Sequence, residues 1–174
     1  MSIFPTSILL ATDGSEEAQL ALRTAVDLAN STNSELHVLT VSREYRPPSE
    51  IPEHGSLLKE VLKDIEREAQ EILDEQVGKV EEAGCTVAKA HLRMGGQPDR
   101  EIVRLSEEVG AGLIVMGSRG LGGLRRVLIG SVSDSVVRHA HCPVLVVRPD
   151  KSADSSHPRR SLRSMLTAHS SRSE

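Results

Sequence analysis

The sequence predicts an α/β fold in which helices cover both faces of a parallel β-sheet. Short apolar runs alternate with longer amphipathic segments, in the order strand, helix, strand, helix, strand, helix, strand, helix, strand. This alternation is typical of parallel sheets, whose right-handed crossovers carry the helices. A chain of 174 residues, 38% of them hydrophobic, is long enough for one domain with a full core. The order of the strands does not follow from this pattern.

Five apolar runs predict the strands. They are Ser7–Thr12, Glu35–Ser42, Thr86–Arg93, Gly112–Met116 and Pro143–Val147. The first run ends in Asp13-Gly14, a dipeptide that favours a sharp exit from a strand. The last run is apolar on both faces, and such a strand at the edge of a sheet promotes aggregation if it is left open. If this run lies at the edge of the sheet, we expect a homodimer in which Pro143–Val147 pairs with its copy across a two-fold axis.

Four amphipathic segments predict the helices. They are Ser15–Asn30, with Ser15 as N-cap, Leu57–Ala83, Pro98–Val109 and Ser131–His139. The second has apolar residues at positions 58, 61, 62, 65, 69, 72, 73 and 80, which is a helical spacing. Between the second strand and this helix, Arg43 to Ser56 contains three prolines and predicts a long loop. A lid over a ligand and a variable surface connection both remain open for this loop.

Composition limits the domain and its partners. Residues 1–149 form the predicted domain, and 150–174, with eight serines in twenty-five residues, predict a disordered Ser/Arg-rich tail. The net charge of −4 and the single Phe, single Tyr and absent Trp argue against a nucleic-acid binder that stacks bases on aromatic rings. No apolar run has membrane-spanning length, and the start of the chain lacks the features of a signal peptide. These features favour a cytoplasmic protein whose two cysteines stay reduced.

A glycine-rich stretch, GSRGLGGLRRVLIGSVSD from Gly117 to Asp134, joins the fourth strand to the last helix and holds five of the thirteen glycines. In open α/β sheets, ligands bind beyond the carboxyl ends of the strands. Glycines let the backbone curl beside phosphates, and the helix start at Gly130 offers unpaired N–H groups. The hydroxyls of Ser131 and Ser133 can add donors. Arg119, Arg125 and Arg126 place positive charge nearby. The stretch matches neither GxxxxGK[ST] nor GxGxxG, so an anion site and a structural turn both remain open.

The spacing Gly117-x2-Gly120-x9-Gly130-Ser131 resembles the G-2x-G-9x-G[ST] signature of the ATP-binding branch of the universal stress protein family. The surrounding sequence also resembles this family. The similar segments are ILLATDGSEEA near the start, HVLTVS in the second strand and LIVMGSRGLGGLRRVLIGSVSDSVVRHAHCPVLVVRP at the end. The resemblance covers about residues 5 to 149. It implies a three-layer, Rossmann-like sandwich with a five-stranded parallel sheet of order 3-2-1-4-5. It also implies a homodimer formed through the final strand.

The same resemblance implies a site for ATP or AMP, with Mg²⁺. Residues matching the adenine and ribose contacts are Ala11, Thr12, Asp13, Val41, Met116 and Gly117, and those matching the phosphate wrap are Gly120, Gly130, Ser131, Val132 and Ser133. Asp13 is expected to hydrogen-bond the nucleotide, or to reach it through a magnesium ion and water. An Asp-Gly pair after a strand is also a common turn, so Asp13 has a purely structural alternative.

Three functions remain open. The first is a nucleotide-binding stress-response or regulatory protein. The second is a slow ATPase, although the sequence shows no nucleophile–base pair and no Walker-type lysine, and we assign no catalytic residue. The third is an interaction module that needs no nucleotide.

The histidines and one cysteine raise a metal interpretation. His139, His141 and Cys142 have a spacing that can bring ligands together, but they precede the last strand, at the end of the sheet opposite the expected site, so a structural role is favoured. His37, His54 and His91 are isolated in sequence, and each is expected to be a surface or core histidine rather than a ligand.

Overall fold

A computed structural model describes residues 3–43, 56–120 and 129–149. Its centre is one five-stranded parallel sheet of order β3-β2-β1-β4-β5, which confirms the expected order. The strands are β1 (Ser7–Ala11), β2 (Glu35–Arg43), β3 (Val87–Gly96), β4 (Ala111–Gly117) and β5 (Val144–Val147). Strand β3 continues past the predicted Arg93 because it stays paired with β2 as far as Arg43 opposite Gly96.

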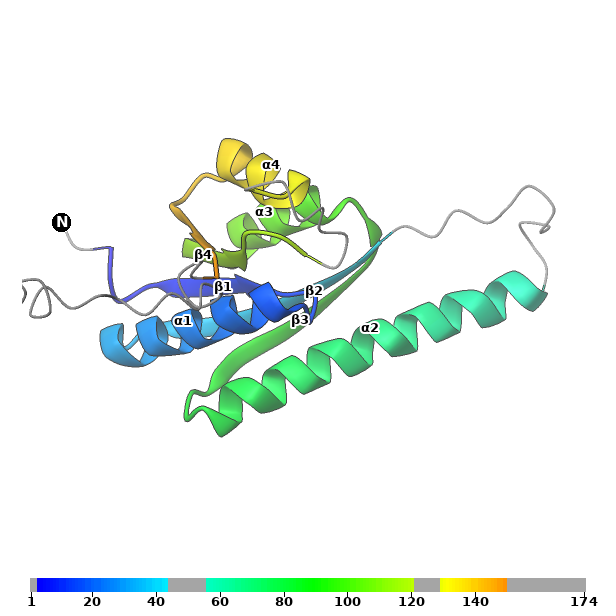
Figure 1. Ribbon diagram of the computed structural model, residues 1–174, viewed down its shortest axis with the longest axis horizontal. Coiled ribbons are helices and arrows are strands. Elements are labelled where there is room, and N and C mark those ends of the chain that lie inside the picture. The colour runs from blue at the N-terminus through cyan, green and yellow to red at the C-terminus, as the bar shows by residue number, and fades with distance from the viewer. Residues whose placement is uncertain (1–2, 44–55, 121–128, 150–174) are drawn as a thin grey trace, which may run out of the picture.

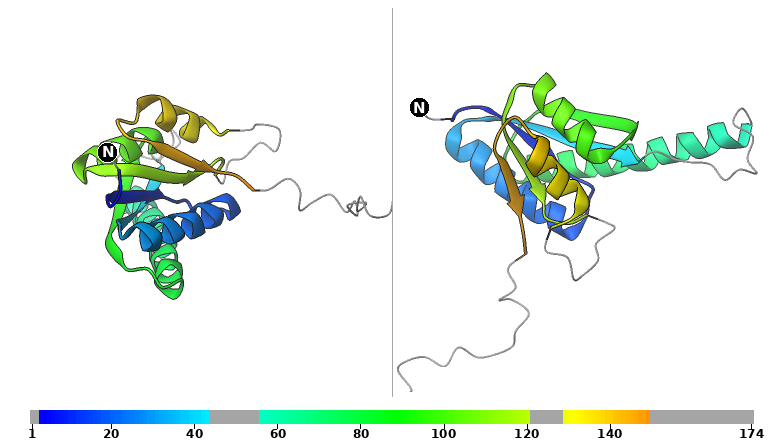
Figure 2. Two further views of the ribbon diagram at one scale, coloured as in Figure 1. Left: turned by 90° about the vertical axis from the view of Figure 1, so that its left-hand side faces the viewer. Right: turned by 90° about the horizontal axis from the view of Figure 1, so that it is seen from above.

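Four helices cover the two faces of this sheet. They are α1 (Glu16–Thr32), α2 (Ser56–Glu82), α3 (Pro98–Glu108) and α4 (Ser131–His139). Helices α1 and α2 lie on one face, and α3 and α4 lie on the other (Figures 1 and 2). The predicted N-cap of the first helix is confirmed, because the Ser15 hydroxyl accepts a hydrogen bond from the Ala18 N–H at 3.3 Å. None of the helices in the described ranges is both long and apolar enough to cross a bilayer.

The sheet separates two hydrophobic cores, and β1 contributes to both. Its residues Ile8 and Leu10 face α1 and α2, whereas Leu9 and Ala11 face α3 and α4. Successive side chains of a strand point to opposite faces, so a central strand with both faces covered is apolar throughout. The buried face of α1 is mostly alanine: Ala18, Ala21, Leu22, Ala25, Val26 and Ala29. All of these except Ala18 belong to the first of the two cores. These short side chains let α1 lie close to the sheet.

Strand β5 lies at the edge of the sheet, as the dimer expectation requires. All four of its residues are half-buried. Leu145 and Val147 pack against the core under α1 and α2, and Val144 and Val146 pack against the core under α3 and α4. The strand is therefore apolar on both faces, and within the described residues it pairs only with β4. The homodimer itself stays a prediction.

Several predictions fall outside the described residues. Most of the proline-rich loop, the middle of the glycine stretch and the Ser/Arg-rich tail correspond to 44–55, 121–128 and 150–174. His54, Arg125 and Arg126 lie in these ranges.

Candidate functional site

The exit of β1 is held by side chains of its own turn. The Thr12 N–H continues the sheet by donating to the Leu39 carbonyl of β2 at 2.9 Å. The Asp13 carboxylate accepts the Ser15 N–H at 3.1 Å, and the Thr12 hydroxyl accepts the Gly14 N–H at 3.3 Å. Gly14 has a φ of 78°, which few other residues adopt. Asp13 thus stabilises the turn after β1, and this structural role does not depend on a ligand.

The exit of β4 leaves little room beside two of its glycines, against a helix backbone at Gly117 and against a side chain at Gly120. A Cβ on Gly117 would lie 3.0 Å from the backbone carbonyl carbon of Glu17 at the start of α1. A Cβ on Gly120 would lie only 2.2 Å from a carboxylate oxygen of Asp13. The backbone after β4 therefore runs directly against α1 and against Asp13. The two features that the sequence placed at strand ends meet in the structure, because β1 and β4 are neighbours.

The start of α4 completes this cluster. Gly130 is its N-cap, without a side-chain cap, and the Gly130 N–H donates to the Ser118 carbonyl at 2.7 Å. The first-turn N–H groups of a helix have no acceptor within the helix, and the N-terminus carries about half a positive charge. The Ser133 hydroxyl is buried and directed inward, to the Ser118 carbonyl at 2.9 Å and the Gly130 carbonyl at 3.0 Å. The Ser131 side chain is exposed. Backbone N–H groups and the Ser131 hydroxyl, rather than Ser133, are thus the donors that this turn presents outward.

Glu17 balances positive charge at the same place. Its carboxylate lies 2.5 Å from the Arg119 guanidinium and accepts the Ser118 hydroxyl at 3.1 Å. The Glu17 side chain is only 13% exposed, so this ion pair is largely shielded from water. Arg119 therefore places positive charge at this turn, as expected, and in this conformation that charge is paired with Glu17.

The remaining expected residues line the same sheet end. Ala11 lies opposite Met116 in the β1–β4 register, and both are buried. Val41 on β2 and Val132 on α4 are partly buried and pack against the core under α3 and α4. The expected site residues thus come from the ends of β1, β2 and β4 and from the first turn of α4.

Gln76 of α2 is a polar residue at this site that the sequence analysis did not identify. It is fully buried, and its side-chain carbonyl accepts the Thr12 hydroxyl at 3.3 Å and the Gln19 amide at 2.9 Å. No partner is found for its Nε2 group within the described part of the chain. The available signal was its place on the apolar face of the helix, between Leu73 and Val80, where a glutamine is unexpected. Gln76 ties α2 to the turn that carries Asp13.

His37 and His91 contact each other, although they are far apart in the sequence. They lie on neighbouring strands β2 and β3, with His37 Nδ1 3.2 Å from His91 Nε2 and the rings stacked at 5.5 Å between centroids. Burial lowers the pKa of His37, and burial together with the neighbouring His37 lowers the pKa of His91 to about 4. The pair is therefore neutral at pH 7, with one imidazole donating to the other. Each was expected to be a surface or core histidine, and the structure shows both half-buried and in contact with each other.

The described residues offer no strong metal centre. Over residues 3–43, 56–120 and 129–149, no group of three or more His, Cys, Asp or Glu side chains is arranged to hold a metal ion. His139 instead contacts its own helix, with Nδ1 2.8 Å from the Ser135 carbonyl. Asp13 is the one expected metal contact at the strand ends, and a single carboxylate can reach Mg²⁺ only together with waters and ligand phosphates.

This fold and this site define a class: doubly wound α/β proteins with a glycine-rich turn and a helix N-terminus beyond adjacent central strands. Within that class, the chain belongs to the universal stress protein family, whose model matches residues 6–148. A universal stress protein of Methanocaldococcus jannaschii, MJ0531, is 40% identical over 147 residues, which cover 83% of this chain and 82% of that protein. The solved structure of UspA from Lactobacillus plantarum superposes with a TM-score of 0.71 at 27% identity and covers 83% of this chain and 99% of that one.

Some solved relatives contain adenine nucleotides. A universal stress protein in complex with cAMP has a TM-score of 0.62 at 30% identity and covers 84% of this chain and 98% of its own. Two structures of lower identity, 24% and 22%, contain dAMP and AMP, and at that identity they support only the shared fold.

Proposed function

We propose that this protein is a stress-response regulator that binds an adenine nucleotide, ATP or AMP, at the carboxyl ends of β1 and β4. One observation carries the proposal: the Asp13 carboxylate, the Gly117–Gly120 backbone and the N-terminus of α4 meet at one point. A helix N-terminus capped by glycine is suited to a phosphate, because its first-turn N–H groups have no acceptor within the helix and the N-cap residue supplies no side-chain acceptor. The relative that contains cAMP supports an adenine nucleotide as the ligand class.

The family signature makes the proposal more specific. Gly117, Gly120, Gly130 and Ser131 retain every fixed position of the spacing found in the ATP-binding branch. Asp13 is the carboxylate through which Mg²⁺ would be held, together with the phosphates and waters. Val41 lies at the end of the next strand, where its backbone can meet the adenine.

Binding without turnover is the favoured activity. No Lys lies among the expected site residues, and the nearest described cation, Arg119, is paired with Glu17. A slow ATPase remains the second candidate, since Asp13 can orient a water. Mass spectrometry of nucleotide released from the denatured protein, followed by incubation with ATP and Mg²⁺, separates the two: intact ATP supports the regulator, and steady formation of ADP supports the enzyme. No calorimetric binding at millimolar ATP would favour an interaction module instead.

The first-turn geometry gives a sharp test at Gly130. Its φ of −72° and ψ of 161° suit any residue, and aspartate is a favoured N-cap, so Gly130→Asp is expected to fold. The new Cβ meets the Ser118 carbonyl at 3.3 Å, which requires only a small adjustment. Its carboxylate places negative charge where the phosphate is proposed to lie, so ATP affinity should fall by about a hundredfold or more.

Gly130→Asn is the matched control, because it has the same shape and cap without the charge. It should lose much less affinity than Gly130→Asp in calorimetry. Equal affinity of the two variants, or normal ATP binding by Gly130→Asp, would show that no phosphate lies at this turn.

We also propose that the protein is a homodimer through Pro143–Val147. The half-buried apolar edge of β5 supports this arrangement, since pairing with a second copy satisfies the backbone groups along that edge. Sedimentation at micromolar concentration is the test, and a monomer there would contradict it.

A further inference from the structure

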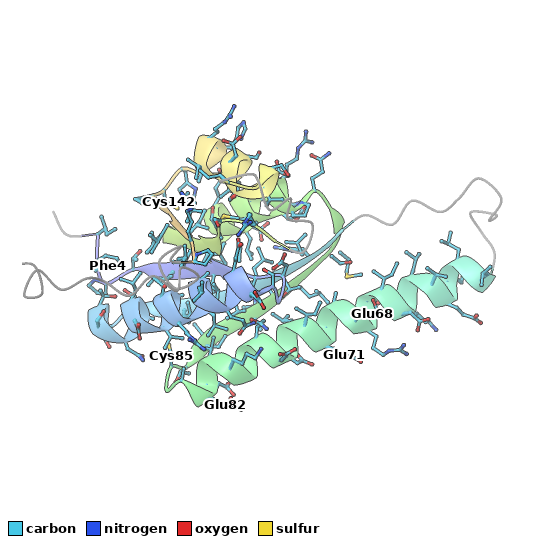
Figure 3. All side chains as sticks on the ribbon, viewed as in Figure 1. Phe4, Glu68, Glu71, Glu82, Cys85 and Cys142 are labelled. Carbon is cyan, nitrogen blue, oxygen red and sulfur yellow. The ribbon has the colours of Figure 1, made fainter. Side chains whose placement is uncertain are left out.

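The first half of α2 extends past the sheet. In Figure 1 this part of the helix lies beyond the ends of β2 and β3, and in Figure 3 Glu68 marks where it leaves the domain. Among the side chains described from Leu57 to Glu68, none is buried, three are half-buried, and the first buried residue is Ala69. We call residues 57–68 the α2 arm.

The α2 arm carries an apolar stripe that the described part of the chain leaves partly open. Leu58, Val61, Leu62 and Ile65 follow the spacing i, i+3, i+4, i+7, so they lie on one face of the helix. The same stripe continues into the buried residues Ala69 and Leu73. Leu62 is 43% exposed. An apolar stripe that serves as core in one half of the helix is thus half-buried at Leu58, Val61 and Ile65 and open to water at Leu62, among the described residues, in the other half, which marks an interaction surface.

We propose that the α2 arm pairs antiparallel with the α2 arm of a second copy of this chain, about a two-fold axis at Leu62. About this axis, position n faces position 124 − n of the other copy. Leu58 then lies within one position of Ile65 of the second copy, and Val61 packs beside Leu62. The apolar stripe is complementary to itself in this arrangement.

The charges at the edge of the stripe favour the same arrangement. Lys59 and Glu66 are seven residues apart, so they lie on the same edge of the stripe about two turns from each other. Antiparallel pairing brings each Lys59 beside Glu66 of the other copy, whereas in parallel pairing the equivalent edges of the two helices lie on opposite sides of the interface, so Lys59 and Glu66 would not meet. Neither side chain has an ion-pair partner in the described part of the chain.

The overall charge of the arm also fits a second copy better than another partner. It holds three basic and four acidic residues, which gives a net charge of −1. A helix that binds anionic lipid or nucleic acid is instead rich in Lys and Arg. Since the arm buries only a few side chains, the contact is small, and interfaces below about 1,200 Å² are typically weak and transient. We therefore expect association that depends on concentration and that links molecules independently of β5 and of nucleotide.

Cysteine cross-linking tests the axis directly in the full-length protein. Leu62→Cys places two thiols at the axis, where a disulfide can form. Leu57→Cys is the matched control, since Leu57 is 56% exposed on the same arm. Its two copies would lie ten positions apart along the helix, about 15 Å, which is beyond disulfide reach. Cross-linking of Leu62→Cys well above both Leu57→Cys and the parent protein supports the proposal. Equal cross-linking of the two variants, or none, overturns it.

Charge exchange tests the direction of the pairing. Lys59→Glu and Glu66→Lys should each weaken association in sedimentation by about twofold to tenfold, and the double variant should restore it. Leu62→Glu should weaken it by at least tenfold. Met94→Glu, which charges an equally exposed apolar residue on β3, should leave it unchanged. A double variant that stays as weak as the single variants would exclude the antiparallel register. Leu62→Glu with unchanged association would exclude the arm as the interface.

Discussion

Replacing Gly117 with alanine should destabilise the fold through one backbone contact. The added Cβ would lie 3.0, 3.1 and 3.2 Å from the carbonyl carbon and oxygen of Glu17 and the nitrogen of Ala18. These atoms belong to the helix backbone and cannot rotate away, so the first turn of α1 must retreat by about 0.5 Å to reach ordinary contact distance. Overpacking of this kind costs about 1–3 kcal/mol of unfolding free energy. We therefore expect Gly117→Ala to unfold at clearly lower urea concentration than the parent.

Gly78→Ala provides a control of opposite sign. Gly78 lies inside α2, and a Cβ there has no atom within 4 Å. Alanine at an open helix position should stabilise the protein by about 0.5–1 kcal/mol. Urea denaturation of both variants at pH 7.5 is the assay. If Gly117→Ala matched or exceeded the parent in stability while Gly78→Ala shifted as expected, the close approach of α1 to β4 would be incorrect.

Two further predictions concern charged and titratable groups. The folded structure lowers the pKa of His91 from its ordinary value of 6.5 to about 4. The neutral pairing of His91 with His37 therefore contributes stability that is complete above about pH 6.5. This stability is lost as the pH falls toward 4, because the unfolded chain takes up the proton first. His91→Asn should therefore lose less stability than the parent between pH 7.5 and 5 in urea titrations, and an unchanged slope would rule out this role. Glu17→Gln should release Arg119 from its ion pair and lower the Kd for ATP by about twofold to tenfold. Glu17→Asp keeps the negative charge and should not lower the Kd. Weaker ATP binding by Glu17→Gln in calorimetry would contradict this electrostatic account.

The elements of the fold could be predicted because their signals are local. Each strand is a short apolar run, each helix has apolar residues at helical spacing, and Ser15 and Gly130 mark helix starts as expected. The order of the strands is not local. It came from the resemblance to a family, since the apolar pattern of β1 alone does not indicate which strands flank it.

The parts of the site that could not be predicted depend on register and on packing between distant segments. His37 and His91 meet only because β2 and β3 pair with Leu39 opposite His91, and nothing in either strand encodes that offset. The pairing of Arg119 with Glu17 could not be predicted, because the two residues lie about a hundred positions apart in the chain. Gln76 is a partial exception, since a glutamine on the apolar face of a helix is by its position alone a sign of a buried polar contact.

The alanine-rich face of α1 sets how tightly the proposed nucleotide site is assembled, although none of those alanines belongs to it. Because their side chains are single methyl groups, the helix lies close to the sheet. This short distance between α1 and the sheet brings the backbone of Glu17 into contact with Gly117. Ala21 and Ala25 are both fully buried, so a larger side chain at either position would increase the distance between the start of α1 and the end of β4. The binding properties of this domain can therefore be tuned from positions that no ligand touches.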